Sequence, residues 1–139
     1  MRRETPIAAA ILVTALAGCG THSLDSKELS SSLRATASLA AETNLFIGYL
    51  QSGYAPPIFA RAHADYLARE LDDERRSLDT ARVNAQLLSA FTFCREQQDE
   101  LGVELRRLEL ALQDPEQLAQ IRARIETIGA SAAQVRAAQ

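Results

Sequence analysis

The fold is decided by residues 114–135, DPEQLAQIRARIETIGASAAQV. Asp114 is a preferred N-cap residue, and Pro115 suits the first turn of a helix. Apolar residues then recur at spacings of three and four, which predicts an amphipathic helix with a coiled-coil-like seam: Leu118, Ile121, Ile125, Ile128, Ala132 and Val135. Gly129 within this stretch costs about 1 kcal/mol relative to alanine and indicates a close approach of another helix. Such a seam needs partner helices.

The first of the partner helices is predicted over residues 25–52. Asp25 and Glu28 have the spacing of a capping box, and Gly53 can adopt the left-handed conformation that ends a helix. Its apolar stripe is expected to be Leu29, Leu33, Ala37, Ala40, Ile47 and Leu50, widened by Leu39 and Phe46.

A second helix is predicted from Pro57, and a third is predicted to end at Gln113. No Gly or Pro separates them, but the apolar stripe changes phase, and we place a turn at residues 80–84 with Asn84 as its C′ residue. The second stripe is expected to be Phe59, Ala62, Tyr66, Leu67, Leu71, Leu78, Ala81, Ala85 and Leu88. The third is expected to be Leu87, Phe91, Cys94, Leu101, Leu105, Leu108 and Leu112.

Four helices of similar length predict an all-α fold, an antiparallel up-down-up-down four-helix bundle. The alternative is three helices with one long central helix of about 57 residues, near 85 Å. The chain is rich in Ala, Leu, Arg and Glu, has no Trp, and carries a net charge of −3. Because no polybasic segment follows the N-terminus, nucleic acid is not an expected partner.

The N-terminus has the pattern of an export signal. Arg2 and Arg3 precede a largely apolar run over residues 7–17, which is shorter than the roughly 20 residues that a membrane-spanning helix needs. The end of this run and the two residues that follow it, Leu16-Ala17-Gly18-Cys19, resemble the lipobox of bacterial lipoproteins. The resemblance implies cleavage before Cys19 and lipidation of that residue, which anchors the protein to a membrane. The mature part resembles small helical envelope lipoproteins.

This resemblance organises the chain as a lipoprotein signal peptide (1–18), a lipidated tether (19–24) and a helical bundle domain (25–139). Gly20, rather than an aspartate, follows the lipidated cysteine. In bacteria with two membranes the resemblance therefore favours the outer membrane, with the bundle facing the periplasm.

Catalytic and metal-binding patterns are missing from the sequence, and neither an enzyme nor a cofactor is expected. Di-metal bundles use Glu-x-x-His motifs, of which the chain has none, so no metal site is expected. His63 shares a helix side with Glu70 and Glu74, and Glu42 is a candidate to face them. Cys94 is expected to be buried and unpaired, because its neighbours are apolar.

The loop between the first two predicted helices is the candidate partner-binding tip, formed by Tyr54, Pro56, Pro57 and Phe59. Two prolines stiffen it, and the aromatic side chains offer anchors. The simpler interpretation, which the sequence favours, is that Phe59 and Ile58 close the core and only Tyr54 lies outside.

The expected function is a structural or protein-interaction role in the cell envelope, with an envelope protein as partner. The alternative is a bundle that binds a small ligand or a metal.

Overall fold

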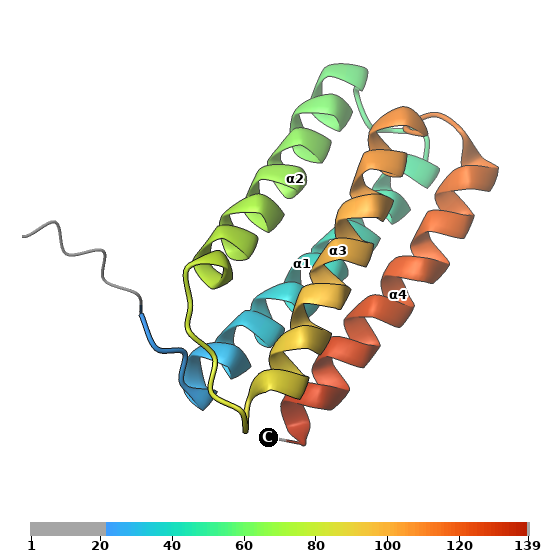
Figure 1. The fold of residues 1–139 in the computed structure, drawn as a ribbon. Coiled ribbons are helices and arrows are strands. Elements are labelled where there is room, and N and C mark those ends of the chain that lie inside the picture. Colours follow the sequence, from blue (N-terminus) through green and yellow to red (C-terminus); the bar gives the residue numbers. More distant parts are fainter. Residues whose placement is uncertain (1–21, 139) are drawn as a thin grey trace, which may run out of the picture.

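The computed structural model describes residues 22–138, which form four helices and, apart from one isolated bridge, no β-structure. The helices are α1 (Ser26–Gln51), α2 (Pro57–Asp79), α3 (Leu88–Leu110) and α4 (Pro115–Ala137). Figure 1 shows them side by side, with successive helices running in opposite directions. The protein is an antiparallel four-helix bundle, as predicted.

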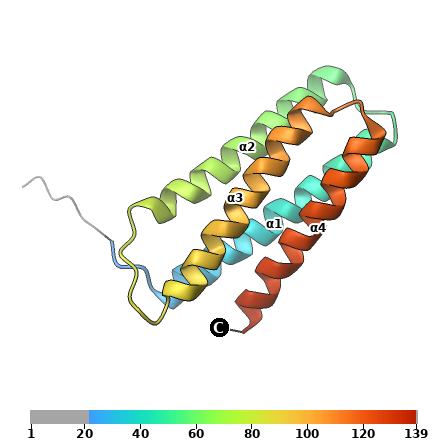
Figure 2. The ribbon, with the colours of Figure 1, turned by 45° about the vertical axis from the view of Figure 1, so that its right-hand side comes forward.

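The bundle has two different ends. The end with loops 52–56 and 111–114 is called the tip, and the end with residues 22–25, loop 80–87 and the end of α4 is called the base (Figures 1 and 2). α1 contacts all three other helices and packs most extensively on α4, whereas α2 and α4 do not contact each other. Because residues 22–25 lie at the base and precede α1, the chain enters the described fold at this end.

The predicted starts of α1 and α4 are confirmed, as is the predicted end of α1. The Asp25 side chain accepts a hydrogen bond from the Glu28 N–H (2.8 Å), and Glu28 Oε2 accepts one from the Asp25 N–H (3.0 Å), which completes the capping box. Gly53 has φ 77°, the left-handed conformation predicted at the end of α1. At α4, Asp114 accepts from the N–H groups of Glu116 and Gln117.

The break between α2 and α3 is confirmed, and the long central helix is wrong. The loop spans residues 80–87, three residues longer than predicted at its C-terminal side. Asn84 does not act as a left-handed C′ residue, because no described non-glycine residue has positive φ. Its side chain instead accepts a hydrogen bond from the Leu87 N–H (2.9 Å), directly before α3.

The same loop holds the chain segment that precedes α1. The Leu24 N–H donates to the Arg82 carbonyl (2.9 Å), and the Arg82 N–H donates to the His22 carbonyl (2.7 Å). Leu24 is buried against the base, and the His22 imidazole contacts the Glu28 carboxylate at 2.7 Å. Residues 22–24, expected to belong to the tether, are thus attached to the bundle.

The core consists of two apolar clusters, one toward the tip and one at the base. The predicted seam of α4 is buried from Leu118 to Ala132, and Val135 is half-buried. Gly129 lies where α1 comes closest, since a Cβ atom built on it meets the Ala40 Cβ at 3.1 Å. The close approach predicted from Gly129 is therefore present.

The predicted stripe of α2 is wrong in its first half. Ala60 and Ala64 face the core, whereas Phe59, Ala62 and Tyr66 are exposed. The stripe is correct from Leu67 to Leu78, with Leu71 and Leu78 buried. It is wrong again at Ala85 and Leu88, which are exposed and lie beyond the end of α2. The aromatic side chains of α2 therefore remain at its boundary with α1, where they belong to the candidate site.

Candidate functional site

The loop between α1 and α2 projects its predicted tip residues into solvent. Pro56 is the N-cap of α2 and Pro57 its first residue, so the two prolines fix the direction in which α2 begins. Tyr54 is 83 % exposed and Ile58 82 % exposed. The interpretation in which Ile58 and Phe59 close the core is wrong, because Phe59 is also 44 % exposed.

A groove of about 610 Å³ lies beneath this loop. It is bounded by the loops before α2 and before α4, so the turn at Asp114–Pro115 lies beside loop 52–56. The residues that line it include Leu50, Gly53, Ala60, Arg61, Leu112 and Leu118. Leu110 also borders the groove and is 90 % exposed. The tip thus combines an apolar groove with projecting side chains.

Aromatic rings continue from the tip along the boundary of α1 and α2. Phe59 stacks on the His63 imidazole (centroids 5.5 Å apart, planes at 13°) and meets the Tyr49 ring edge-on at 5.8 Å. His63 also contacts Phe46 at 4.6 Å and Tyr66 at 5.5 Å. These contacts make one connected cluster of five rings.

This cluster was not predicted, because the expected apolar stripe of the second helix placed Phe59 and Tyr66 in the core. The sequence pattern that indicates the cluster is the spacing of Phe59, His63, Tyr66 and Glu70. Intervals of four, three and four residues place these side chains on one side of a helix. That side is rotated away from Ala60 and Ala64, which form the buried side of α2.

Two carboxylates adjoin the aromatic cluster. Glu42 of α1 faces His63, as the sequence suggested, with 3.5 Å between Oε1 and Nε2. The negative charges of Glu70, chiefly, and of Glu42 raise the pKa of the Tyr66 phenol, with a smaller contribution from burial. Among the described residues, no Arg or Lys nitrogen lies within 4.0 Å of either carboxylate.

His63 therefore belongs to an aromatic and acidic surface. Within residues 22–138, no group of three or more His, Cys, Asp and Glu side chains is arranged to hold a metal ion. Glu74, which the sequence placed on the same helix side, has a raised pKa, mainly because of burial and then because of the neighbouring charges of Glu70 and Asp73.

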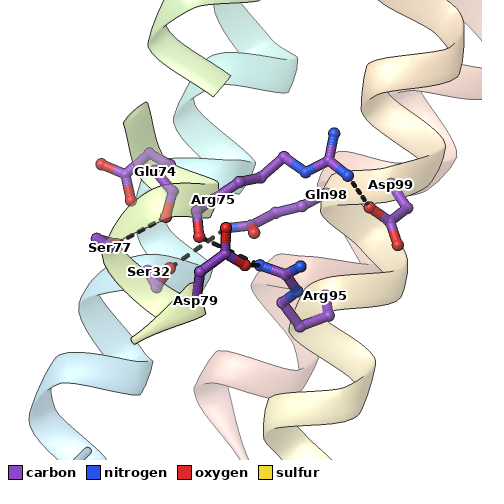
Figure 3. A network of polar contacts seen from close by, with 8 residues as sticks. All are labelled: Ser32, Glu74, Arg75, Ser77, Asp79, Arg95, Gln98 and Asp99. Atoms are coloured by element: carbon purple, nitrogen blue, oxygen red, sulfur yellow. Dashed lines mark hydrogen bonds and ion pairs between the residues drawn. The ribbon is translucent and has the colours of Figure 1, made fainter. Parts of the chain in front are cut away.

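A polar layer crosses the bundle nearer to the base. Figure 3 shows Gln98 of α3 extending to Ser32 of α1; its Nε2 donates to the Ser32 and Thr36 hydroxyl oxygens, each at 3.3 Å. The Gln98 Oε1 atom is buried and has no hydrogen-bond partner. At the edge of the same layer, Arg95 pairs with Asp79 (2.5 Å) and Arg75 with Asp99, which links α3 to α2 (Figure 3).

Cys94 lies next to this layer and is fully buried, as predicted. Among the described residues it is a free cysteine. Burial raises the pKa of its thiol, and hydrogen bonds with Ser32 and Thr36 partly oppose that shift. A thiol with a raised pKa is mostly protonated at neutral pH and is a poor nucleophile. The environment of Cys94 is that of a packing residue.

Cys19, the predicted lipidation site, lies outside the described residues, as does the expected signal peptide, residues 1–18. None of the helices within residues 22–138 is both long and apolar enough to cross a membrane. Comparison with protein-family models, curated proteins and solved structures found no match to this chain. The candidate site is therefore defined by its geometry alone.

Proposed function

We propose that the mature protein, starting at Cys19, is a lipid-anchored helical bundle of the cell envelope with a structural or protein-interaction role. In a bacterium with two membranes, the anchor lies in the outer membrane and the bundle faces the periplasm. The tip is presented to an envelope protein. The lipobox-like motif supports the anchor, and the arrangement of the bundle supports the interaction role.

The short connection from Cys19 to the base supports an orientation in which the tip points away from the membrane. His22 is hydrogen-bonded at the base, and three residue steps separate it from Cys19, a reach of at most about 11 Å. The helices contain 23 to 26 residues, which corresponds to about 35–39 Å. The tip then extends this distance from the anchored end.

The observation that carries the interaction role is the uneven distribution of exposed apolar side chains. Of the nine large hydrophobic side chains that are exposed in the described residues, six lie on the tip loop or along the adjoining parts of α1 and α2: Leu45, Tyr49, Tyr54, Ile58, Phe59 and Tyr66. Tyrosine is enriched where protein interfaces derive most of their binding energy.

Metabolic labelling with a clickable fatty acid tests the anchor. The wild-type protein and a Cys94→Ser variant should both be labelled, whereas Cys19→Ser should not, because the buried Cys94 is not an acylation site. Equal labelling of Cys19→Ser and wild type would contradict the lipid anchor.

Site-specific photocrosslinking in intact cells tests the interaction role. A photoreactive amino acid at Tyr54 should give a discrete crosslinked product, and the same group at Arg124, exposed on α4, should not. The same products from both positions, or none from Tyr54, would contradict a partner at the tip.

The second candidate function is binding of a small ligand within the bundle, favoured by the unpartnered Gln98 Oε1. A groove of about 310 Å³ between α1 and α2 reaches Ser32, one of the groups that Gln98 contacts. No metal is expected to stabilise the fold. A rise in melting temperature with zinc that His63→Ala abolishes would instead favour a metal-binding bundle, because a native-state ligand at a hundred times its dissociation constant adds about 2.7 kcal/mol.

A further inference from the structure

The boundary of α1 and α2 presents an aromatic and acidic surface whose partner can be described chemically. We call it the α1–α2 face and define it by Tyr49, Phe59, His63 and Tyr66 together with the carboxylates Glu42 and Glu70. Tyr49 is 41 %, Phe59 44 % and Tyr66 40 % exposed. Each of these rings is thus held by neighbours on one side and open to solvent on the other.

The rings are held in place before any partner arrives. Phe59 is stacked on His63 and meets Phe46 edge-on at 6.3 Å, and the Phe46 side chain is buried in the core. The Tyr49 hydroxyl donates to the Tyr54 carbonyl at 3.4 Å. Side chains that are already ordered lose little conformational freedom on binding, which favours affinity.

The charge of the face is negative and is not neutralised locally. The only described basic side chain within 4.0 Å of Glu42 is His63, and Glu70 forms no ion pair with another described residue. The last turn of α1 contains no basic residue, so its carbonyl ends add partial negative charge beside Tyr49. A cation is the complementary charge.

We propose that the α1–α2 face binds an arginine-bearing segment of a protein partner. A guanidinium stacks on exposed aromatic rings and at the same time donates paired hydrogen bonds to a carboxylate, which matches the rings and carboxylates that adjoin here. The proposal rests on the protein-interaction role proposed above and is independent of the lipid anchor.

Two other occupants fit the face less well. A second copy of this chain, related by two-fold symmetry, would place one negatively charged face against another, because such an interface uses the same patch on both copies. An anionic membrane surface would be repelled by Glu42 and Glu70. The charge on the face therefore selects a basic protein segment.

Intrinsic fluorescence reports on this surface selectively. The chain has three tyrosines and no tryptophan, and Tyr49, Tyr54 and Tyr66 all lie on the face or on the adjoining loop. We would titrate the mature, lipidated protein in maltoside detergent with an acetylated peptide of alternating arginine and glycine, which does not fluoresce. The signal should change saturably, weaken with added salt, and stay constant with the matching glutamate–glycine peptide.

A matched pair of variants tests the assignment. The double variant Glu42→Gln/Glu70→Gln should raise the dissociation constant of the arginine peptide at least tenfold, equivalent to about 1.4 kcal/mol. The double variant Glu96→Gln/Glu100→Gln removes the same charge from exposed positions of α3 and should change it less than twofold. Tyr66→Leu keeps apolar area but removes a ring, and should reduce the preference for the arginine peptide over a lysine–glycine peptide.

Three results would overturn the inference: no saturable change with the arginine peptide, the same response to the glutamate peptide, or equal losses in the two double variants. Failure here leaves the rest of the proposed function measurable, since crosslinking from Tyr54 reports a partner of any chemistry. Failure of the lipid anchor is likewise separate, because Cys19→Ser should bind the arginine peptide as the wild type does.

Discussion

Gly48 of α1 and Gly129 of α4 differ in how much space their surroundings leave for a side chain. A Cβ atom at Gly129 meets the Ala40 Cβ at 3.1 Å, so a side chain there requires Ala40 or its helix to shift by a few tenths of an ångström. A Cβ atom at Gly48 meets only the flexible Arg122 side chain, at 3.8 Å. The same substitution therefore has different consequences at the two positions.

Gly48→Ala should stabilise the protein by up to about 1 kcal/mol, because alanine is the better helix former and nothing rigid is displaced. Gly129→Ala should lose most of this gain to the contact with Ala40, and Gly129→Leu should destabilise by about 1–3 kcal/mol through overpacking. Chemical denaturation of the three variants measures these differences. Equal gains for both alanine variants would show that α1 and α4 are less closely packed.

Cys94 should resist thiol reagents in the native protein. It is fully buried, and burial raises the pKa of its thiol, so both access and thiolate content are low. Ellman's reagent should react slowly with the mature protein under native conditions and completely in denaturant. Rapid native labelling, or a disulfide-linked dimer on a non-reducing gel, would contradict the burial of this residue.

At the scale of the helices, Asp114, the N-cap of α4, should make the free energy of unfolding depend on pH in the acidic range. Hydrogen bonds from the Gln117 N–H, chiefly, and from the Gln117 side chain and Glu116 N–H lower the pKa of Asp114. Because the folded-state pKa lies below the unfolded value of about 3.9, the cap contributes stability above that pH and loses it as the pH falls through the folded-state pKa.

An Asp114→Asn variant keeps a side-chain acceptor at every pH, and its stability should therefore fall less between about pH 4 and pH 2 than that of the wild type. Denaturation midpoints measured across this range provide the comparison. Glu100→Gln, on an exposed part of α3, should follow the wild-type curve. If Asp114→Asn also runs parallel to the wild type, the cap does not control the acid response.

The helix boundaries that depend on neighbouring residues could be predicted from the sequence. The capping box at Asp25, the left-handed Gly53 and the Asp114–Pro115 start involve groups within a few residues of each other, and all three are present. The end of the α2–α3 loop could not be predicted as well, because Arg82 is held by residues 22–24, which are distant in sequence.

The candidate site was only partly predictable for a related reason. The predicted tip residues Tyr54, Pro56, Pro57 and Phe59 are all exposed. The expected stripe of the second helix nevertheless placed Phe59 and Tyr66 in the core, because large apolar side chains are usually buried. In the structure the small side chains of Ala60 and Ala64 on α2 face the core of the bundle. Phe59 instead packs on Phe46 at the boundary with α1. The buried side of α2 is therefore the side that carries the two alanines, and not the side that carries the larger side chains.

At the scale of the whole molecule, the three tyrosines are far from the end at which the anchor would attach. Even Tyr66, the nearest, lies 13 residues before the end of α2, a distance of about 20 Å along the helix. Leu88 lies at the base instead and is 55 % exposed. If Cys19 anchors the base, Leu88 lies close to the bilayer and the three tyrosines lie farther from it.

Spin-labelled phospholipids, which quench fluorescence only at short range, should therefore leave the tyrosine emission of the membrane-bound wild type nearly unchanged. A Leu88→Tyr variant introduces a fourth tyrosine at the base and should show an additional, quenched component, because fewer than four residues separate the described chain from Cys19. Strong quenching in the wild type would mean that the bundle lies along the membrane, and the α1–α2 face would then be unavailable to a protein partner.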